Sequence, residues 1–419
     1  MSLFEVLKSP IRIKYLIIGL LVCLFRAITK IFPRNNRKWL FGSIYGTFKD
    51  NSKYLFIETI ENHPEIRAIW IGRNDKEILF LRDKGFEAYY WLSIKGLYHA
   101  LTSKVYICDH QVGDINAFLS GGSFYVNLWH GSSVKRVKWQ APSYYVRHYH
   151  LKDESEMRNN LCFRLLEYSD MFIKPDLCLA PSEVQSREFF APMMDIDISN
   201  CIVGVFPRSR LLIGGKRMAL DFIRKYEPED SLQSISKFKG YNKVYIYMPT
   251  WRNDHRDFVS QANISWERLN DLMKEKNELF ILKFHPLTKG VELGKLSQYS
   301  NIQLYPSACD IYTILPFVDC LITDYSSIYT DFLLMNKDII LFVFDYEEYM
   351  ESSYKLEDYD HYFVGKRVRD FDQLLQVISN GDNCLVPRED YVRLMDFFWS
   401  SNRYNIDLVD NIWKRVSVQ

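Results

Sequence analysis

Short apolar segments recur along this chain and alternate with segments of helical character. From Lys38 onward these runs are rich in β-branched and aromatic residues. Runs that are apolar throughout are typical of parallel strands that are buried on both faces. The pattern predicts a first series of strands at residues 38–43, 66–72, 104–110, 124–131, 176–182 and 200–207.

A second series follows a mostly polar stretch at residues 206–242. Helices are predicted within it at 265–277 and 327–336, and the last forty residues also have helical character. The alternation of strands and helices in two series predicts two α/β domains joined near residue 210, each with a parallel sheet. The predicted strands of the second series lie at residues 243–251, 279–286, 301–306, 319–327 and 338–345.

Length and composition agree with two well-packed domains. The chain has 419 residues, too many for one ordinary core, and 47% of them are hydrophobic. The formal net charge of +1 provides no general attraction for nucleic acid, and no nucleic-acid partner is predicted. The 8 cysteines are scattered without a CxxC pair, so we expect a reducing compartment with neither a disulfide framework nor a zinc site.

The amino-terminal segment is basic and apolar together. Residues 1–38 carry eight Lys or Arg and one acid, and eleven uncharged residues lie at 15–25. As a helix, those eleven span roughly 16 Å, about half the hydrocarbon thickness of a bilayer. Arg12, Arg26 and Lys30 share one helical face. We predict a helix lying in a membrane interface with this face toward anionic headgroups; a core helix with snorkelling ends is the alternative.

Unusual polar residues cluster where predicted strands end. Ligands bind beyond the carboxyl ends of the strands in an open parallel sheet, so these clusters predict one cleft between two facing sheets. The clusters are His130-Gly131, Pro249 to Arg252, His285-Pro286 and Asp324 to Ser327.

The second-domain clusters suit an anionic ligand. Ser326 and Ser327 would begin a helix, where free backbone N–H groups and hydroxyls favour a phosphate, although plain helix capping uses the same groups. Asp324 is better suited to holding another side chain or a hydroxyl in place. The Arg252 guanidinium can clamp phosphate oxygens, or it can simply pair with Asp254 at the surface.

Two histidines are candidates for proton transfer. His130 has a side chain whose pKa suits proton abstraction near neutrality, and the cations in Lys135 to Lys138 are expected to hold that pKa down. A solvated basic strip is the alternative for those cations. His285 could donate to a leaving phosphate, or be an ordinary turn histidine. No GxxxxGK[ST] loop, GxGxxG, GxSxG or HxxxH is present, which favours transfer from a nucleotide-activated donor.

In this order, these elements resemble the CDP-glycerol glycerophosphotransferase family, whose members build teichoic acids and related poly(polyol phosphate) capsule polymers. Two departures, Ser132-Ser133 in place of Thr-Pro and Ser209-Arg210 in place of Asn-Asp, leave open a substrate other than glycerol phosphate. The resemblance covers about residues 37–400 and rests on WHGSSVK (129–135), GVFPRS (204–209), PTWR (249–252), HP (285–286), DIYTILP (310–316) and TDYSS (323–327) with Asp331.

The resemblance implies a glycosyltransferase-B type α/β fold with two Rossmann-like lobes facing a central cleft. Residues 37–208 would form the acceptor and catalytic-base lobe, and 209–419 the CDP-donor lobe with C-terminal helices, after a membrane-surface helix at 1–36. The implied reaction transfers glycerol phosphate or ribitol phosphate from a CDP-polyol to a hydroxyl of a lipid-linked or growing acceptor, and CMP leaves. The implied location is the cytoplasmic face of the bacterial membrane, as a peripheral protein.

The resemblance also implies roles for individual residues. His130 would activate the acceptor hydroxyl, and His285 would be the second catalytic histidine. No tightly bound cofactor or metal is implied, and a divalent-ion requirement is left open. Lys135 and Gly131 would support the acceptor or its charge. The implied donor-binding residues are Arg208, Pro249, Thr250, Arg252, Thr323, Asp324, Ser326 and Ser327.

Two other functions stay open. One is a sugar transferase of the same two-lobe fold that uses a nucleotide-sugar donor. The other is a non-catalytic membrane scaffold. Release of CMP, and not of a nucleoside diphosphate, would distinguish polyol-phosphate transfer from sugar transfer. Any turnover would distinguish it from a non-catalytic scaffold.

Overall fold

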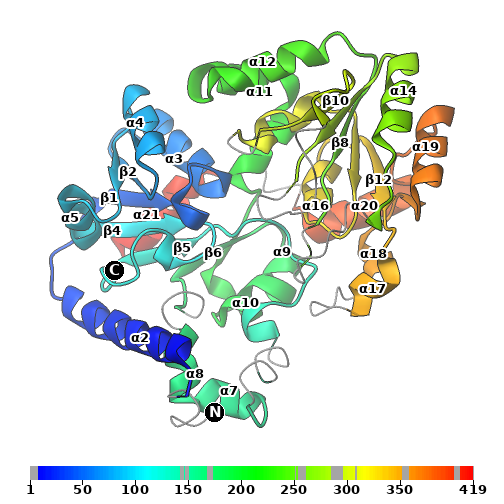
Figure 1. Cartoon of the computed structure of the whole chain (residues 1–419). Coiled ribbons are helices and arrows are strands. Elements are labelled where there is room, and N and C mark those ends of the chain that lie inside the picture. Colours follow the sequence, from blue (N-terminus) through cyan, green and yellow to red (C-terminus); the bar gives the residue numbers. More distant parts are fainter. Residues whose placement is uncertain are drawn as a thin grey trace. The chain divides into compact units, whose positions relative to one another are not determined.

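The computed structural model describes residues 8–141, 146, 151–167, 173–250, 252, 261–284, 296–306, 309–351, 358–400 and 406–418. The chain forms two compact units (Figure 1). Unit 1 comprises Met1–Arg208 and Phe397–Gln419, and unit 2 comprises Ser209–Asp396. The C-terminal residues thus belong to unit 1, whereas the sequence grouped 209–419 together.

Unit 1 contains a seven-stranded sheet in the order β3-β2-β1-β4-β5-β6-β7, and every neighbouring pair is parallel. The strands are β1 (Asn35–Gly42), β2 (Arg67–Gly72), β3 (Ala88–Tyr90), β4 (Ser103–Cys108), β5 (Phe124–Asn127), β6 (Leu177–Ala180) and β7 (Cys201–Val203). The helices are α2 (Pro10–Thr29), α3 (Asp50–Asn62), α4 (Asp75–Asp83), α5 (Ile94–Thr102), α7 (Glu154–Asn159), α8 (Leu161–Glu167), α9 (Glu183–Gln185), α10 (Ala191–Met194) and α21 (Leu408–Ser417).

Unit 2 contains a six-stranded parallel sheet in the order β10-β9-β8-β11-β12-β13. The strands are β8 (Val244–Tyr247), β9 (Leu279–Leu282), β10 (Ile302–Leu304), β11 (Cys320–Thr323), β12 (Asp338–Phe342) and β13 (Lys366–Val368). The helices are α11 (Arg210–Tyr226), α12 (Glu229–Phe238), α14 (Trp266–Lys276), α16 (Ile328–Leu333), α17 (Tyr346–Glu351), α18 (Tyr359–Tyr362), α19 (Phe371–Asn380) and α20 (Arg388–Phe398), whose last two residues belong to unit 1.

The prediction of two parallel α/β units is confirmed. The apolar runs became strands because their side chains are buried on both faces: all four residues are buried in each of β5, β6, β8, β9 and β11. The sequence missed β3 and β13. Both are edge strands of only three residues, and β13 also lies among charged residues, so neither was distinguished as a buried strand.

The polar stretch at 206–242 is not a simple linker, because α11 and α12 occupy most of it. Its apolar residues recur at helical spacing: Leu212, Ala219, Ile223 and Tyr226 of α11 are buried, as is Phe238 of α12. The high polar content concealed that periodicity.

The two sheets share one topology. Within each, the second and third strands lie on one side of the first strand, and the later strands lie on the other side. The direction of winding therefore reverses between β1 and β4 in unit 1 and between β8 and β11 in unit 2. Such a switch point leaves a crevice at the carboxyl ends of the two strands, where ligands bind in doubly wound folds.

Helix α2 packs on unit 1 through the face that was predicted to meet lipid headgroups. Gly19 lies so close to α8 that an added Cβ would be 1.9 Å from the Leu165 carbonyl oxygen. Leu16 and Val22 are buried beside it. Neither α2 nor any other described helix is both long and apolar enough to cross a bilayer.

Part of the amino-terminal positive charge is used inside unit 1. The Arg34 guanidinium donates to the carbonyl oxygens of Ala100, Ser103, Leu119 and Gly121, at distances of 2.5–3.1 Å. Lys38 is buried and donates to Thr102 Oγ1 at 2.7 Å. These two cations are therefore not available to a membrane surface. The positive charge that the amino-terminal segment can present to a membrane is smaller than the sequence suggested.

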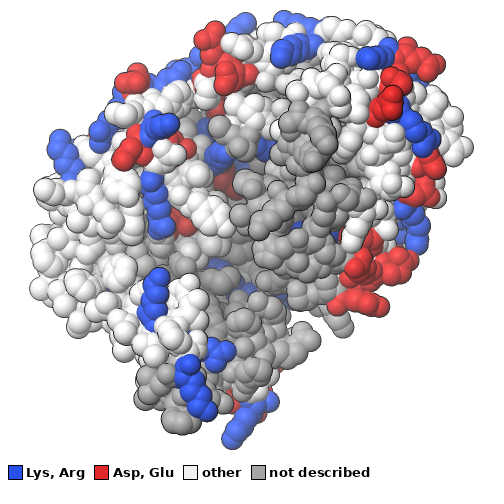
Figure 2. All heavy atoms as spheres, in the orientation of Figure 1, with Lys and Arg blue, Asp and Glu red and all other residues white. Residues whose placement is uncertain are grey.

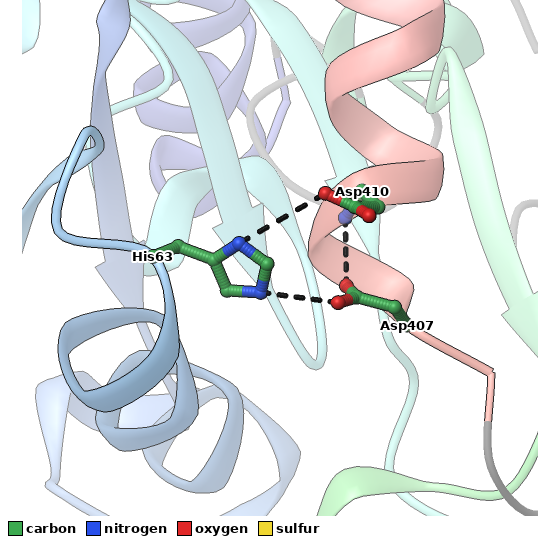
Figure 3. A group of neighbouring side chains, drawn as sticks. All are labelled: His63, Asp407 and Asp410. Atoms are coloured by element: carbon green, nitrogen blue, oxygen red, sulfur yellow. Dashed lines mark hydrogen bonds and ion pairs between the residues drawn. The ribbon is translucent and has the colours of Figure 1, made fainter.

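A histidine ties the C-terminal helix to unit 1 (Figure 3). His63 follows α3, and its Nε2 lies 3.3 Å from Asp407 Oδ2, while its Nδ1 lies 3.4 Å from Glu65 Oε1 and 3.9 Å from Asp410 Oδ1. Asp407 also caps α21, because its side chain accepts the Asp410 N–H. The imidazole thus joins the end of one helix to the start of another.

We expect His63→Ala to lower the free energy of unfolding by about 1 kcal/mol, because the lost contacts are to half-exposed carboxylates. Urea denaturation measures the change. His361→Ala, at an exposed histidine of α18, is the control and should change the free energy of unfolding by less than half as much. Equal effects of the two substitutions would show that His63 does not anchor α21.

Candidate active site

A buried carboxylate spans the switch point of unit 1. Asp109 follows β4 and is fully buried. Its carboxylate accepts from Ser43 Oγ at 3.1 Å and from the backbone N–H groups of Ile44 and Ser52, each at 3.3 Å. Burial, followed by the negative charges of Asp50 and Asp114, raises the pKa of Asp109. Asp109 therefore holds together the end of β1 and the start of α3.

His130 lies at the carboxyl end of β5, next to Asp109. Its Nδ1 is 3.1 Å from the Asp109 carbonyl oxygen. A carbonyl oxygen can only accept, so Nδ1 carries the proton of the neutral ring and Nε2 keeps its lone pair. The Trp129 ring stacks on the imidazole with centroids 4.2 Å apart. This arrangement leaves Nε2 as the atom that can remove a proton.

The loop before His130 is held in an unusual conformation. Trp129 has a left-handed φ of 52°, which costs energy for a bulky residue. Its N–H donates to Asn127 Oδ1 at 2.8 Å, and its carbonyl oxygen accepts from Asn51 Nδ2 at 2.7 Å. Two buried asparagines therefore hold this strained conformation immediately before His130.

Burial is the main cause of the low pKa of His130. The pKa is lowered to about 4, first by burial, then by the charge of His110, with a smaller contribution from Arg208. The sequence attributed this lowering to Lys135 and its neighbours, whereas burial and His110 are its largest causes. The imidazole is neutral at pH 7, as a general base requires.

Arg208 approaches the same strand ends from the end of unit 1. It is buried, and its Nη1 donates to Asp50 Oδ1 at 2.5 Å, while its backbone N–H donates to Asn51 Oδ1 at 3.3 Å. Asp50 begins α3 with a left-handed φ of 61°. Arg208 and His130 are thus connected through the first turn of α3.

The first sequence departure has a structural counterpart. The Ser133 N–H donates to Gln185 Oε1 at 2.9 Å, and Gln185 Nε2 donates back to the Ser133 carbonyl oxygen at 3.0 Å. A proline at this position would lack that N–H. The reciprocal hydrogen bonds between Ser133 and Gln185 therefore fix the loop after His130 without a proline.

Two other predicted site residues lie in the same loop. Gly131 has a φ of 147°, and the Lys135 side chain is partly exposed.

Unit 2 repeats the arrangement at its own switch point. Asp324 follows β11, is fully buried, and accepts from the backbone N–H and the hydroxyl of Thr250, at 2.8 and 2.6 Å. Thr250 stands beyond the end of β8, after the buried Pro249. Asp324 thus spans β8 and β11 as Asp109 spans β1 and β4.

Arg252 is held by carboxylates. Its Nε and Nη2 donate to the two Asp345 oxygens at 2.8 and 3.0 Å, and Nη2 also donates to Asp324 Oδ2 at 2.9 Å. The guanidinium is 2% exposed and lies 5.2 and 4.8 Å from the ring centroids of Tyr325 and Tyr349. Burial alone would lower the pKa of Arg252, but the two carboxylates outweigh it and raise the pKa.

This geometry corrects the role assigned to Arg252. A buried guanidinium that donates to Asp324, Asp345 and the Thr250 carbonyl oxygen holds the protein together, so we assign it a positioning role instead of a phosphate clamp. Asp254, the alternative partner considered from the sequence, lies outside the described residues. Thr323 is also engaged internally, because its hydroxyl donates to the Met248 carbonyl oxygen at 2.7 Å.

Ser326 and Ser327 differ from the residues around them. Both are partly exposed, whereas residues 320–325 and 328–333 are buried. The Ser326 hydroxyl accepts the Ile328 N–H at a long 3.4 Å as the chain enters α16. These are therefore the hydroxyls of the TDYSS segment that a ligand can reach.

The boundary between the units is anchored on both sides. Arg208 is fixed in unit 1, and the next residue, Ser209, donates from Oγ to Asp331 Oδ1 at 2.9 Å in unit 2. Tyr312 donates to the other oxygen of Asp331 at 2.7 Å. The serine of the second sequence departure thus reaches the buried Asp331 of the TDYSS element.

Some expected residues cannot be placed, and some site residues were missed. His285, Pro286 and Trp251 lie outside the described residues. Asp109 and His110 were not selected, although they end the run KVYICDH and obey the same strand-end rule that selected His130. Asp345 was not selected either, although it ends the predicted strand at 338–345; its pairing with Arg252 is decided only by folding.

One group of described residues has ligand atoms suitably placed for a metal ion. His63, Asp407 and Asp410 bring such atoms within 4.8 Å of one another (Figure 3). They lie at the opposite end of the 13-residue α3 from Asp50, roughly 20 Å away along the helix. Their contacts are explained by the anchoring of α21.

The chain is thus a protein of two parallel α/β units with Rossmann strand order. Each unit places charged and hydroxyl groups at its switch point, where ligands bind in folds of this kind. The chain belongs to the CDP-Glycerol:Poly(glycerophosphate) glycerophosphotransferase family, whose model matches residues 24–399. The family resemblance inferred from the motifs is therefore confirmed.

Known relatives include polymerases of both polyols. A teichoic acid poly(glycerol phosphate) polymerase of Bacillus spizizenii is 25% identical over 83% of this chain and 84% of its own length. The teichoic acid ribitol-phosphate polymerase TarL of Staphylococcus aureus is 30% identical over 46% of this chain, but this match spans only 34% of TarL. The structure of the wall teichoic acid polymerase TagF aligns with a TM-score of 0.68 at 19% identity, covering 100% of this chain and 98% of that one, which shows a shared fold.

We expect Arg252→Ala to lower the free energy of unfolding by about 3–5 kcal/mol, because it leaves two buried carboxylates without their cation. Arg252→Lys should recover only part of the loss, since an ammonium cannot reproduce the forked contacts. Urea denaturation measures both.

Arg369→Ala is the matched control. Arg369 also pairs with a carboxylate in unit 2, Glu347, but both side chains are exposed, so its loss should cost less than about 1 kcal/mol. If Arg252→Ala were no worse than this control, the positioning role would be wrong.

Proposed function

We propose that this chain transfers a polyol phosphate from a CDP-polyol to a hydroxyl of a teichoic-acid or capsule-type acceptor and releases CMP. The family match carries the proposal, because residues 24–399 include the strand-end clusters of both units. The polyol is glycerol or ribitol, since relatives named for each are found. A lipid-linked or growing polymer is the proposed acceptor.

In the proposed reaction, His130 Nε2 takes the proton of the acceptor hydroxyl. The oxygen then forms a bond to the polyol-bearing phosphorus, and the bond from that phosphorus to the CMP oxygen breaks. The neutral ring and the Nδ1 contact with the Asp109 carbonyl support this role for His130. Lys135 and Gly131 are proposed to support the acceptor.

The donor is proposed to bind at the switch point of unit 2. Ser326 and Ser327 offer reachable hydroxyls for the diphosphate, and His285 is proposed to assist the departing CMP. Pro249, Thr250, Thr323 and Asp324 act by shaping this strand end, with Arg252 holding Asp324 in place. Arg208 is proposed to add positive charge at the end of unit 1.

The proposed architecture is of the glycosyltransferase-B type, with the two strand-end clusters facing one substrate across a central cleft. The repeated strand order and the two switch points support it. The proposed division keeps residues 37–208 for the acceptor and the donor site within residues 209–396.

We expect His130→Ala to reduce CMP release from a CDP-polyol by about a hundredfold or more, because a positioned base is lost. Ser326→Ala and Ser327→Ala should each cost about tenfold or more while leaving the free energy of unfolding nearly unchanged, since both side chains are partly exposed. The assay follows CMP by chromatography and weighs the lengthened acceptor by mass spectrometry.

His361→Ala is the control in this assay and should leave the rate unaltered. Release of a nucleoside diphosphate from a nucleotide sugar would instead identify a sugar transferase. Absence of turnover with every donor would identify a non-catalytic scaffold.

We also infer that α2 rests on an anionic membrane surface, at the cytoplasmic face of the bacterial membrane, by its outer apolar side. Its outward residues include Ile17, Leu20 and Leu24, each at least 50% exposed. Around α2 the visible surface is largely uncharged with scattered Lys and Arg (Figures 1 and 2). A helix with exposed apolar side chains and flanking cations suits the lipid interface. Its Gly19 face packs on the protein, so the apolar side, and not the predicted basic side, would enter the lipid.

We expect the double substitution Leu20→Glu and Leu24→Glu to weaken binding to phosphatidylglycerol-containing vesicles about tenfold or more. Each of these exposed leucines would contribute more than about 1 kcal/mol when it enters the lipid. Vesicle co-sedimentation measures binding. The control is Leu79→Glu in α4, because Leu79 is 58% exposed but lies away from α2. Unchanged binding of the double variant would remove α2 from the membrane contact.

A further inference from the structure

A second imidazole lies beside His130 and has no role in the reaction as proposed so far. His110 follows Asp109 at the end of β4, and β4 pairs with β5 with Cys108 opposite Asn127. The residues just beyond these two strands therefore meet at the same edge of the sheet. The rings of His110 and His130 lie 5.8 Å apart between centroids and are tilted by 53°.

The backbone of His110 is fixed by a hydrogen bond, whereas its ring Nδ1 has no hydrogen-bond partner in the described part of the chain. Its carbonyl oxygen accepts from Asn127 Nδ2 at 3.1 Å. Its Nδ1 is buried without a hydrogen-bond partner among the described residues, and the nearest carboxylate oxygen, Asp114 Oδ1, is 3.8 Å away. The side chain is 24% exposed, so other atoms of the ring reach solvent.

A buried polar atom without a partner is costly and calls for an explanation. Asp114 is almost fully buried, and its other oxygen accepts the Gln111 N–H at 2.9 Å, so the carboxylate is held in place behind the ring. A proton on Nδ1 would face this carboxylate, and a protonated ring would then present a second N–H toward solvent beside His130.

We propose that His110 is a second substrate-contacting imidazole of the active site, which is held by Asp114 and donates to a non-bridging oxygen of the transferred phosphoryl group. The proposal rests on the proposed function. His130 removes the proton of the acceptor hydroxyl, and His110 neutralises charge on the phosphoryl oxygen as the new bond forms and CMP leaves. No proton of His110 is consumed in the overall reaction.

The neighbouring charges are compatible with this division of roles. Asp114 faces His110, whereas the charges around His130 are those of Asp50, Arg208 and His110 itself. The charge of His110 disfavours protonation of His130, the second cause of the lowered pKa after burial. Replacing His110 by a neutral side chain therefore removes one cause of the low pKa of His130.

The first experiment needs no substrate. In the full-length protein, the imidazole C–H signals of His130 and His110 are followed by NMR against pH, in the native chain and in His110→Gln. Loss of the nearby charge should raise the His130 titration midpoint from about 4 by about half a unit or more. Inorganic phosphate should shift the His110 signals of the native chain, and Asp114→Asn should weaken that response.

The second experiment measures turnover of a CDP-polyol. His110→Gln should lower kcat by about a hundredfold, as expected for one donor to transition-state charge, and should move the acidic limb of the kcat/KM profile to higher pH. A merely structural role would not move that limb. His361→Gln is the control, and thermal unfolding confirms that each variant is folded.

The two readouts separate failures of different origin. If the native chain turns over no CDP-polyol while the His130 midpoint still depends on His110, the proposed function fails and the pairing of the two rings stands. If His110→Gln leaves the His130 midpoint unchanged and the rate within twofold of the native chain, the role of His110 is overturned.

Discussion

A buried carboxylate at each switch point is the constraint on which both candidate sites depend. Asp109 and Asp324 occupy equivalent places, just beyond the strand that follows the reversal of winding. Each accepts a hydroxyl and a backbone N–H from the chain leaving the first strand: Ser43 and Ile44 in unit 1, and Thr250 in unit 2. A buried carboxylate must be satisfied by donors, so these turns have little freedom to move.

The two units satisfy that carboxylate differently, and the difference suits different tasks. Asp324 has a full cation, Arg252, which Asp345 and two tyrosine rings hold in turn. Asp109 has neutral donors, and its carbonyl oxygen orients His130. Unit 1 thus keeps its imidazole neutral, whereas unit 2 builds a rigid charged cluster behind two reachable serines. These environments suit the proton removal proposed for unit 1 and the diphosphate binding proposed for unit 2.

Charge counted along the sequence proved a poor guide to charge at the surface. The amino-terminal segment is basic, but Arg34 and Lys38 are used inside unit 1, and α2 turns apolar side chains outward. A similar lesson applies to Arg252, whose guanidinium points into the protein. All three residues are cations whose partners come from distant parts of the chain, and only the tertiary structure reveals these partners.

The sequence by itself determined the two parallel units, the strand-end positions of His130, Asp324, Ser326 and Ser327, and the family. These features depend on local composition, because an apolar run followed by a polar cluster marks a buried strand and its exposed end. The tertiary structure alone decided which side chains meet. Asp345 joins Arg252, and His110 joins His130, because strands far apart in sequence become neighbours in the sheets. It also decided which face of α2 is buried, since a helical period identifies faces but not what packs against them.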